Sequence, residues 1–306
     1  MNFQPLSLPQ AVLLSTRAPF LLLPLMCVLV GIASAVLADA DISYALMALL
    51  TLFCVLAHIS VNLLNEYHDF KSGLDYHTQR TPFSGGSGSL PQRPQAASWV
   101  LAAALTTLVL LVLIGLYLIV QISAASFVSM AIIGVLGLLL IVLYTGPINR
   151  SPLLCLIAPG LGFGILMVLG IHLLLVGSVN ATACISALIV FFLTNNLLLL
   201  NQFPDIEADK MAGRKHALIV YGPTISAGIF ALFWALALLS LVLGVALQLL
   251  PDWTLLALLG FIPGAVSISG AFKYGAELGQ CPGYLATNVM CALFSPLLLG
   301  VGLLLG

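Results

Sequence analysis

Long apolar runs dominate this sequence and determine its fold class. Nine runs hold roughly 20 or more predominantly apolar residues, enough for a helix to cross the hydrocarbon of a bilayer. The apolar residues are continuous rather than alternating, which favours helices over strands. The predicted spans are residues 18–38, 43–66, 97–120, 124–145, 153–176, 182–203, 222–249, 254–273 and 284–305. The pattern therefore predicts an all-α integral membrane protein with nine transmembrane helices.

Composition supports the same class. Of 306 residues, 61% are hydrophobic and 6% are charged, whereas about a quarter of the residues in soluble domains are charged. Nine Lys and Arg with ten Asp and Glu are too few to cover a soluble globule, so membrane lipid is the predicted surrounding. The net charge of −1 gives no reason to expect nucleic acid as a partner.

The basic residues predict the orientation in the membrane. With nine spans, the loops on the side opposite the N-terminus hold Asp39, Asp41 and Asp252 but no Lys or Arg. Cytoplasmic loops carry the excess of positive charge, so the N-terminus is predicted to be cytoplasmic. The residues on the N-terminal side are Arg17, Lys71, Arg80, Arg93, Arg150, Lys210, Arg214, Lys215 and Lys273.

Two polar clusters repeat at equivalent positions, residues 65–75 after the second span and residues 201–210 after the sixth. A shift of 136 residues places Asn65 on Asn201 and Asp69 on Asp205. We interpret the chain as a single domain, residues 1–306, with two related four-helix halves at about 18–145 and 153–273. A final helix, at about 284–305, follows them. Repeats of this kind often enclose a site between the halves.

The spacing within the clusters predicts a metal site. Residues four apart share a helix face, and Gly73 is expected to end the helix so that Asp75 folds back. Carboxylates that converge in a partly desolvated cavity repel one another unless a cation intervenes, and oxygen ligands with a phosphorylated substrate suit Mg²⁺. Alternatively, the acids form an ordinary solvated loop. The predicted ligands of two or more Mg²⁺ ions are Asn65, Asp69, Asp75, Asn201, Asp205 and Asp209.

Other polar residues are candidates for substrate contacts. Lys71 and Arg80 lie in the first cluster and the loop after it, and Arg17 lies at the cytoplasmic end of the first span. Each can contact phosphate oxygens or can serve only as a topology signal. His58 precedes Asn65 by about two helical turns and can face the same cavity, or it can bond to a neighbouring helix. Tyr144 lies at the end of the fourth span, where aromatic residues are also common for interfacial reasons.

These motifs resemble those of the UbiA superfamily of intramembrane prenyltransferases. Residues 65–75, Asn-Glu-Tyr-His-Asp-Phe-Lys-Ser-Gly-Leu-Asp, are similar to the first motif of its menaquinone branch, the 1,4-dihydroxy-2-naphthoate prenyltransferases. Residues 201–209, followed by Ala212-Gly213, are similar to the second motif, and residues 144–147 are similar to a further segment. Two positions depart from that branch: Pro204 replaces a basic residue, and Phe163 replaces an acidic one after Gly160-Leu161-Gly162.

The resemblance implies an enzyme that transfers a polyprenyl group from a polyprenyl diphosphate to an aromatic acceptor, here 1,4-dihydroxy-2-naphthoate. It implies Mg²⁺ and an active site at the cytoplasmic face of the inner membrane. Alternatives are another acceptor (a different quinone precursor, a tetrapyrrole or a glycerol phosphate) or a cation-coupled transporter, whose sites lie nearer the bilayer centre. In the implied roles, the catalytic residues are Asp69, Asp75, Asp205 and Asp209, the diphosphate-binding residues are Lys71, Arg80 and Arg17, and the acceptor pocket contains Tyr144 and His58.

Overall fold

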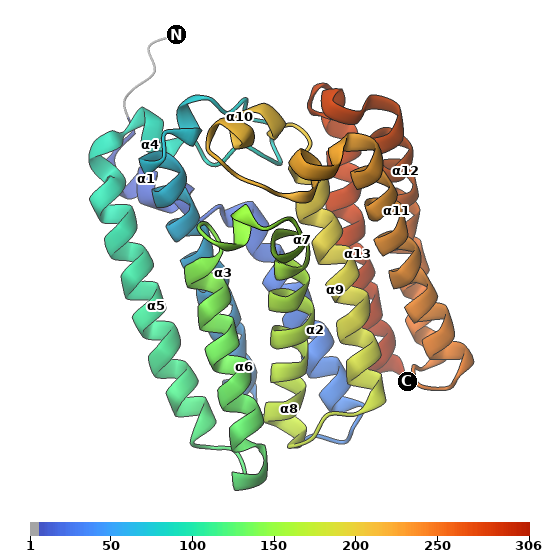
Figure 1. Ribbon diagram of the computed structural model, residues 1–306. Helices are drawn as coiled ribbons and strands as arrows, with labels where there is room; N and C mark the ends of the chain where they lie inside the picture. The colour runs from blue at the N-terminus through green and yellow to red at the C-terminus, as the bar shows by residue number, and fades with distance from the viewer. Residues whose placement is uncertain (1–5) are drawn as a thin grey trace.

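The computed structural model describes residues 6–306 and is a bundle of long helices (Figure 1). Within that range, nine helices are long and apolar enough to cross a membrane, and no strand occurs. The predicted fold class is therefore confirmed. The second span ends at Lys71 rather than at residue 66, so residues 65–71 of the first polar motif are helical. The spans are Ala18–Val36, Tyr44–Lys71, Pro94–Ile119, Ala124–Leu143, Pro152–Val176, Ala181–Asn201, Ala217–Ala246, Asp252–Gln280 and Pro282–Leu305.

The secondary structure consists of helices and short helical turns joined by brief connections. The long α-helices are α2 (Leu22–Val36), α3 (Tyr44–Lys71), α5 (Ala97–Ile119), α6 (Ala124–Leu143), α9 (Ala181–Asn201), α11 (Ala217–Ala246), α12 (Leu258–Tyr274) and α13 (Pro282–Leu305). The fifth span combines α7 (Pro152–Gly160), the π-helical segment η5 (Leu161–Leu169) and α8 (Gly170–Val176). The short elements are α1 (Leu8–Ser15), η1 (Ala18–Leu21), η2 (Leu74–Tyr76), α4 (Ser89–Gln92), η3 (Pro94–Ala96), η4 (Ile148–Arg150), α10 (Ile206–Met211), η6 (Asp252–Ala257) and η7 (Gly275–Gln280).

The two helices that carry the motifs have clear start signals. Ser43 caps α3, where its hydroxyl accepts the Leu46 N–H at 3.2 Å. Asn180 caps α9, where its Oδ1 accepts the Ala183 N–H at 2.8 Å. Both caps satisfy backbone donors that the first turn of a helix leaves free. Each helix then runs through to the polar end of the bundle, so each motif arrives there on a rigid element.

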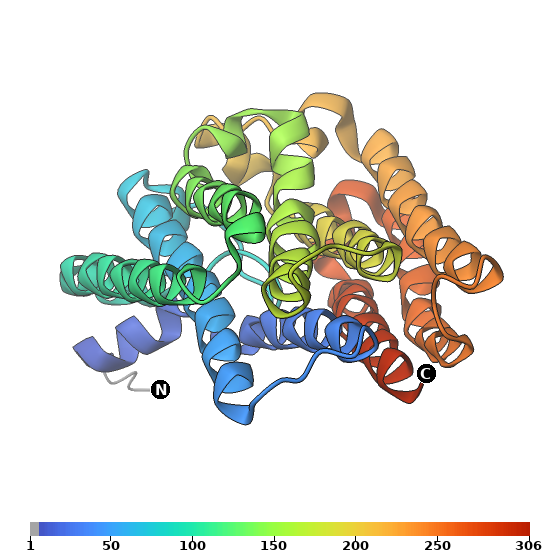
Figure 2. The same ribbon diagram turned by 90° about the horizontal axis from the view of Figure 1, so that it is seen from below.

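Helices α2, α9 and α13 form the interior of the bundle. Their spans are the most buried, and small and branched residues such as Ala33, Ala187 and Val190 fill the space between them. Viewed along the helices, α5 lies at one edge of the bundle, and α11 and α12 lie at the opposite edge (Figure 2). The interior helix α9 is thus held on several sides, which fixes the second motif.

The short polar elements gather at one end of the bundle. Figure 1 shows α1, α4 and α10 at this end, above the ends of α3 and α9. Both motifs therefore emerge on one face, as predicted. The single domain and its division into two related halves remain predictions, and the predicted domain includes residues 1–5, which lie outside the described range.

Candidate functional site

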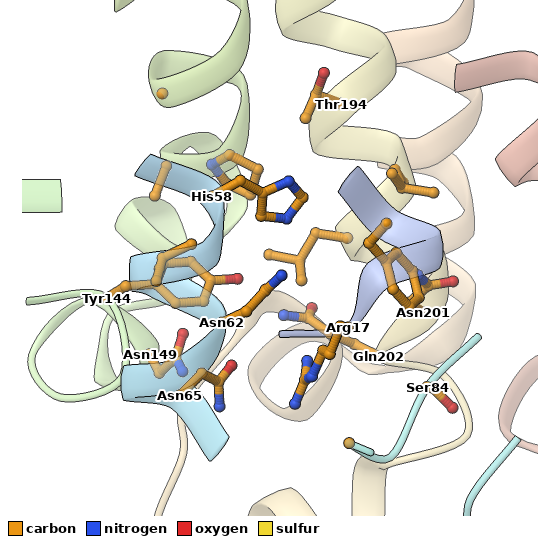
Figure 3. Close-up of a pocket in the computed structure, with 18 of the residues that line it drawn as sticks. Arg17, His58, Asn62, Asn65, Ser84, Tyr144, Asn149, Thr194, Asn201 and Gln202 are labelled. Atoms are coloured by element: carbon orange, nitrogen blue, oxygen red, sulfur yellow. The ribbon is translucent and has the colours of Figure 1, made fainter. Parts of the chain in front are cut away.

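A cavity of about 290 Å³ lies at the polar end of the bundle. Its walls come from α3, α6, η5 and α9, and its rim comes from residues 74–86 and 201–216. Figure 3 shows side chains of α3 and α9, including Asn65 and Asn201, around the same space. All six predicted metal ligands line this cavity: Asn65, Asp69, Asp75, Asn201, Asp205 and Asp209.

The first motif reaches the cavity from α3 and from the turn after it. Asn65 and Asp69 are one turn apart, and the Asn65 amide donates a hydrogen bond to the Asp69 carboxylate. Gly73 follows the helix with φ of 81°, a left-handed conformation that glycine adopts readily. This reversal brings Asp75, in η2, back over the end of α3, where its side chain is buried.

The second motif is interrupted where the sequence favoured a continuous helix. Helix α9 ends at Asn201, and α10 begins at Ile206 after the break at Pro204, because proline lacks the N–H that a continuing helix needs. Asp205 precedes α10, and its carbonyl accepts the Asp209 N–H at 2.9 Å. His216 Nε2 lies 2.9 Å from Asp209 Oδ2. The broken helix still directs both carboxylates to the cavity.

Arg214 joins the two motifs directly. One of its terminal nitrogens lies 2.5 Å from Asp69 Oδ1 and the other lies 2.8 Å from Asp209 Oδ1. Gly213, with φ of 75°, turns the chain after α10 so that Arg214 returns to the cavity. A single guanidinium therefore neutralises one carboxylate from each motif.

Burial controls the charge state of the other two acids. Desolvation raises the pKa of Asp75 to about 7, and the nearby Glu66 and Asp69 add to the rise. Desolvation also raises the pKa of Asp205 to about 7, with Asp209 as the second cause. Burial alone lowers the pKa of Arg214, but Asp69 and Asp209 outweigh it and the pKa is raised. Arg214 thus stays charged, while within residues 6–306 neither Asp75 nor Asp205 forms an ion pair.

The donor set fits Mg²⁺, although the ligands are not gathered in advance. In residues 6–306, no three His, Cys, Asp or Glu side chains are grouped closely enough to hold a metal ion. Three oxygens from the motifs are nevertheless buried with no hydrogen-bond partner in the described structure: Asp75 Oδ2, Asn201 Oδ1 and Asp205 Oδ1. Unpaired buried acceptors are costly, and hard oxygen donors are the ligands Mg²⁺ prefers.

The predicted basic contacts divide into two groups. Arg17 lines the cavity, where it also forms an ion pair with Glu66. Lys71 and Arg80 do not line it. Lys71 follows Asp69 by two residues, about 200° around the helix, and its ammonium lies over the Tyr67 ring. Arg80 is exposed and donates a hydrogen bond to the Asp75 carbonyl at 3.3 Å.

The deeper part of the cavity is mainly apolar. His58 and Tyr144 line it, as the sequence predicted, together with residues such as Leu140 and Leu197. His58 is 8% exposed, and its Nδ1 has no hydrogen-bond partner in the described part of the chain. The Phe163 ring packs edge-on against His58 at 4.9 Å between ring centroids. A polar rim over an apolar interior suits a ligand with a charged head and a hydrocarbon body.

A model of the UbiA prenyltransferase family matches residues 24–280. The chain belongs to this family. The matched region includes both acidic motifs and the whole cavity wall formed by α3, α6, η5 and α9. The resemblance inferred from the motifs is thus confirmed at the level of the family, and with the nine spans it makes the chain an integral, multi-pass membrane protein.

Individual UbiA relatives extend the comparison. The chain is 28% identical over 172 residues to 1,4-dihydroxy-2-naphthoate octaprenyltransferase of Bacillus subtilis (strain 168). This match covers 55% of the chain and 52% of that protein, so it spans about half the length of the curated relative. An apo UbiA homolog from Aeropyrum pernix K1 has a similar fold, with a TM-score of 0.68, 16% identity and coverage of 94% of this chain and 98% of that one. A UbiA homolog from Archaeoglobus fulgidus bound to DMAPP and Mg²⁺ gives a TM-score of 0.58 at 16% identity, covering 96% and 98%.

Several polar cavity residues of this UbiA-family protein were not predicted as site residues, among them Asn149, Gln202 and Arg214. Asn149 and Gln202 lie at the rim, and Arg214 bridges the motifs. The one available signal was that Arg214 follows Gly213 at the end of the second motif, where a turn back toward Asp209 is easy. Nothing in the local pattern indicates its partner on α3, which lies 145 residues earlier.

Proposed function

We propose that this protein transfers a polyprenyl group from a polyprenyl diphosphate to an aromatic acceptor in a Mg²⁺-dependent reaction. The observation that carries the proposal is the convergence of both acidic motifs on one cavity, where three of their buried oxygens have no hydrogen-bond partner among the described residues. Family membership supports it, as does the Archaeoglobus homolog bound to DMAPP and Mg²⁺. A cation-coupled transporter is less consistent, because the acids lie at span ends rather than in the middle of the bundle.

The diphosphate would bind at the polar rim. Asp75, Asp205 and Asn201 supply the unpaired oxygens that would hold Mg²⁺, with Asp69 and Asp209 nearby. Bound Mg²⁺ would supply positive charge that stabilises the pyrophosphate leaving group as the allylic C–O bond breaks. Of the three predicted diphosphate contacts, Arg17 lines the cavity and Lys71 and Arg80 do not, so we place Arg17 in the proposed diphosphate site.

Cationic side chains of the protein complement this charge. Arg17 and Arg214 both line the cavity, and guanidinium groups bind phosphate oxygens well. Arg214 is committed to Asp69 and Asp209 in the structure described. Metal binding by these carboxylates would release it toward the diphosphate, whereas Arg17 already borders the cavity.

The apolar interior would exclude water from the reacting allylic group. A reactive carbocation is quickly captured by water, so a dry wall protects it. Leu140, Leu197 and the Phe163 ring provide such a wall, and His58 and Tyr144 are the polar groups available to orient an acceptor.

For the acceptor we propose 1,4-dihydroxy-2-naphthoate, the compound in the name of the Bacillus relative. A different acceptor is the second candidate, because Phe163 stands in the cavity where many members of that branch carry an acid. Purified protein offered a radiolabelled polyprenyl diphosphate with each of several aromatic acceptors distinguishes the two. Preference for an acceptor other than 1,4-dihydroxy-2-naphthoate would overturn the first assignment.

The catalytic role of the cavity is tested with the same assay. Asp69→Ala and Asp205→Ala should abolish transfer in a protein that still purifies as a folded species, and EDTA should stop turnover until Mg²⁺ is restored. Glu207→Ala is the matched control, because Glu207 is exposed and forms a surface ion pair with Lys210. Full activity in either aspartate variant, or transfer that is insensitive to EDTA, would refute the metal assignment.

We further propose that the cavity opens to the cytoplasm. The basic residues at the polar end of the bundle support this orientation. Single cysteines at positions 87 and 210, in a cysteine-free background, should react with an impermeant thiol reagent only after the cytoplasmic side of the membrane is exposed. Labelling of both positions in sealed cells would show that the polar end faces outward and would refute the proposed orientation.

A further inference from the structure

Glu66 is a fully buried acid within the first motif, and it is not among the residues that line the cavity. Oε1 lies 2.6 and 2.7 Å from two guanidinium nitrogens of Arg17 and accepts the Ser87 N–H at 2.8 Å. Oε2 accepts the Ser87 hydroxyl at 2.5 Å. Both oxygens are thus already bonded to protein, which distinguishes Glu66 from Asp75 and Asp205, whose oxygens include unpartnered ones.

The first partner of Glu66 is a residue in an unfavourable backbone conformation. Arg17 has φ of 55° and ψ of 52°, the left-handed region, at the turn between α1 and η1. For a residue other than glycine this conformation costs roughly 1–2 kcal/mol and persists only where surrounding contacts hold it. Two contacts from α3 do so, the Glu66 ion pair and the bond from Asn62 Nδ2 to the Thr16 carbonyl at 3.0 Å.

The second partner is the glycine loop, which we define as residues 84–88. Gly85, Gly86 and Gly88 have left-handed φ angles of 84°, 72° and 70°, and the first two line the cavity together with Ser84. Ser87 lies between Gly86 and Gly88 and is the loop residue that is bonded to Glu66. Its hydroxyl also bonds to Ser89 at 3.0 Å, and Ser89 Oγ lies 2.7 Å from Ser15 Oγ of α1.

We propose that Glu66 is a positioning residue that fixes Arg17 and the glycine loop together at the rim, where they bind the diphosphate. The inference rests on the proposed function of this cavity. A carboxylate suits this role because it accepts from a guanidinium and from a backbone N–H at once, with charge-assisted bonds. The glycine loop also packs closely against Glu66, because a Cβ added to Gly86 would lie 3.2 Å from Glu66 Oε1 and 3.3 Å from Asp75 Oδ1.

Glu66→Gln tests the proposal, because it keeps the shape of the side chain and removes the charge. With farnesyl diphosphate as the probe, we expect the dissociation constant in Mg²⁺ to rise about tenfold. The KM for the acceptor and the Mg²⁺ concentration for half-maximal binding should change less than twofold. Hydrogen exchange in the peptide that contains residues 84–89 should accelerate at least tenfold. Glu207→Gln is the matched control and should leave all four quantities unchanged.

Ser87→Ala is the second variant and decides the matter where Glu66→Gln does not fold. It removes the hydroxyl bonds of the loop and leaves the Arg17 ion pair, so exchange in residues 84–89 should rise with a smaller loss of farnesyl diphosphate affinity. Unchanged exchange in the folded variants overturns the proposal. A weakening of Mg²⁺ binding as large as that of Asp75→Asn would also overturn it, because Glu66 would then be a ligand.

The exchange measurement also separates this inference from the proposed function. Hydrogen exchange can be measured without turnover. Accelerated exchange in a protein that transfers no prenyl group would therefore support the positioning role of Glu66 and reject the proposed prenyl transfer. Prenyl transfer with unchanged exchange would do the reverse.

Discussion

Arg214 provides the sharpest test of how the two acidic motifs are held together. Replacing it with glutamine leaves Asp69 and Asp209 without their shared cation in a largely buried setting, since the Arg214 side chain is 19% exposed and the carboxylates are 10% and 3% exposed. Removing one partner of a buried ion pair costs about 3–5 kcal/mol. Asp209 keeps its contact with His216, so the lower end applies and the metal-free protein should lose about 3 kcal/mol of unfolding free energy.

The measurement is equilibrium unfolding in detergent micelles, followed by circular dichroism, first in EDTA and then in saturating Mg²⁺. The metal offsets the same negative charges, so the loss caused by Arg214→Gln should fall to less than half in Mg²⁺. Lys215→Gln is the control, because Lys215 follows Arg214 in the chain and its side chain is exposed. This substitution should change stability by no more than about 0.5 kcal/mol. An equal loss with and without Mg²⁺, or no loss at all, would refute the view that Arg214 takes the place of a cation.

Three further predictions follow from the site and the packing around it. The pKa values of Asp75 and Asp205 are raised to about 7, and metal binding requires their ionised forms. The apparent Mg²⁺ affinity should therefore fall about 100-fold from pH 8 to pH 6. A calorimetric titration that gives the same Mg²⁺ affinity at both pH values would contradict this prediction. Asp205→Asn should lower the rate of prenyl transfer on the order of 100-fold. It should not destabilise the metal-free protein at pH 8, because the fold disfavours the ionised carboxylate that the amide replaces. Glu207→Gln is the control, and a loss of unfolding free energy as large as the loss of activation free energy would argue that Asp205 has a structural role. Gly164→Ala should cost about 1–3 kcal/mol, because its Cβ would lie 2.7 Å from a carbonyl oxygen of α9; Gly134→Ala, whose Cβ meets nothing within 4 Å, should not destabilise, and equal effects of the two would contradict the packing argument.

Much of the fold was predictable, because lipid imposes simple rules on a chain. Span lengths and the placement of basic residues depend on local composition, so the predicted spans agree with the observed helices apart from their ends. The Asn-x-x-x-Asp repeat likewise identified Asp69 and Asp205 without knowledge of how the helices pack. These features depend only on residues close together in the sequence.

Contacts between distant segments were not predictable in the same way. Arg214 bonds to Asp69 across 145 residues and Arg17 bonds to Glu66 across 49, and no periodicity in either segment indicates its partner. Lys71 is a different case. The sequence already placed Lys71 on the helix that ends before Gly73, and helical geometry alone directs its side chain away from Asp69.

The exposure of α6 at the edge of the cavity has a consequence for how substrates reach the proposed enzyme. In the most apolar stretch of this helix 6% of the residues are buried, the smallest share among the nine spans of the described chain. Three residues of the helix nevertheless border the cavity, Gly137, Leu140 and Ile141. A small sideways displacement of α6 would connect the cavity to the surrounding acyl chains and leave α3 and α9 in place. Water-insoluble reactants and products would then be exchanged within the bilayer, while the acidic motifs at the ends of α3 and α9 keep their places around the cavity.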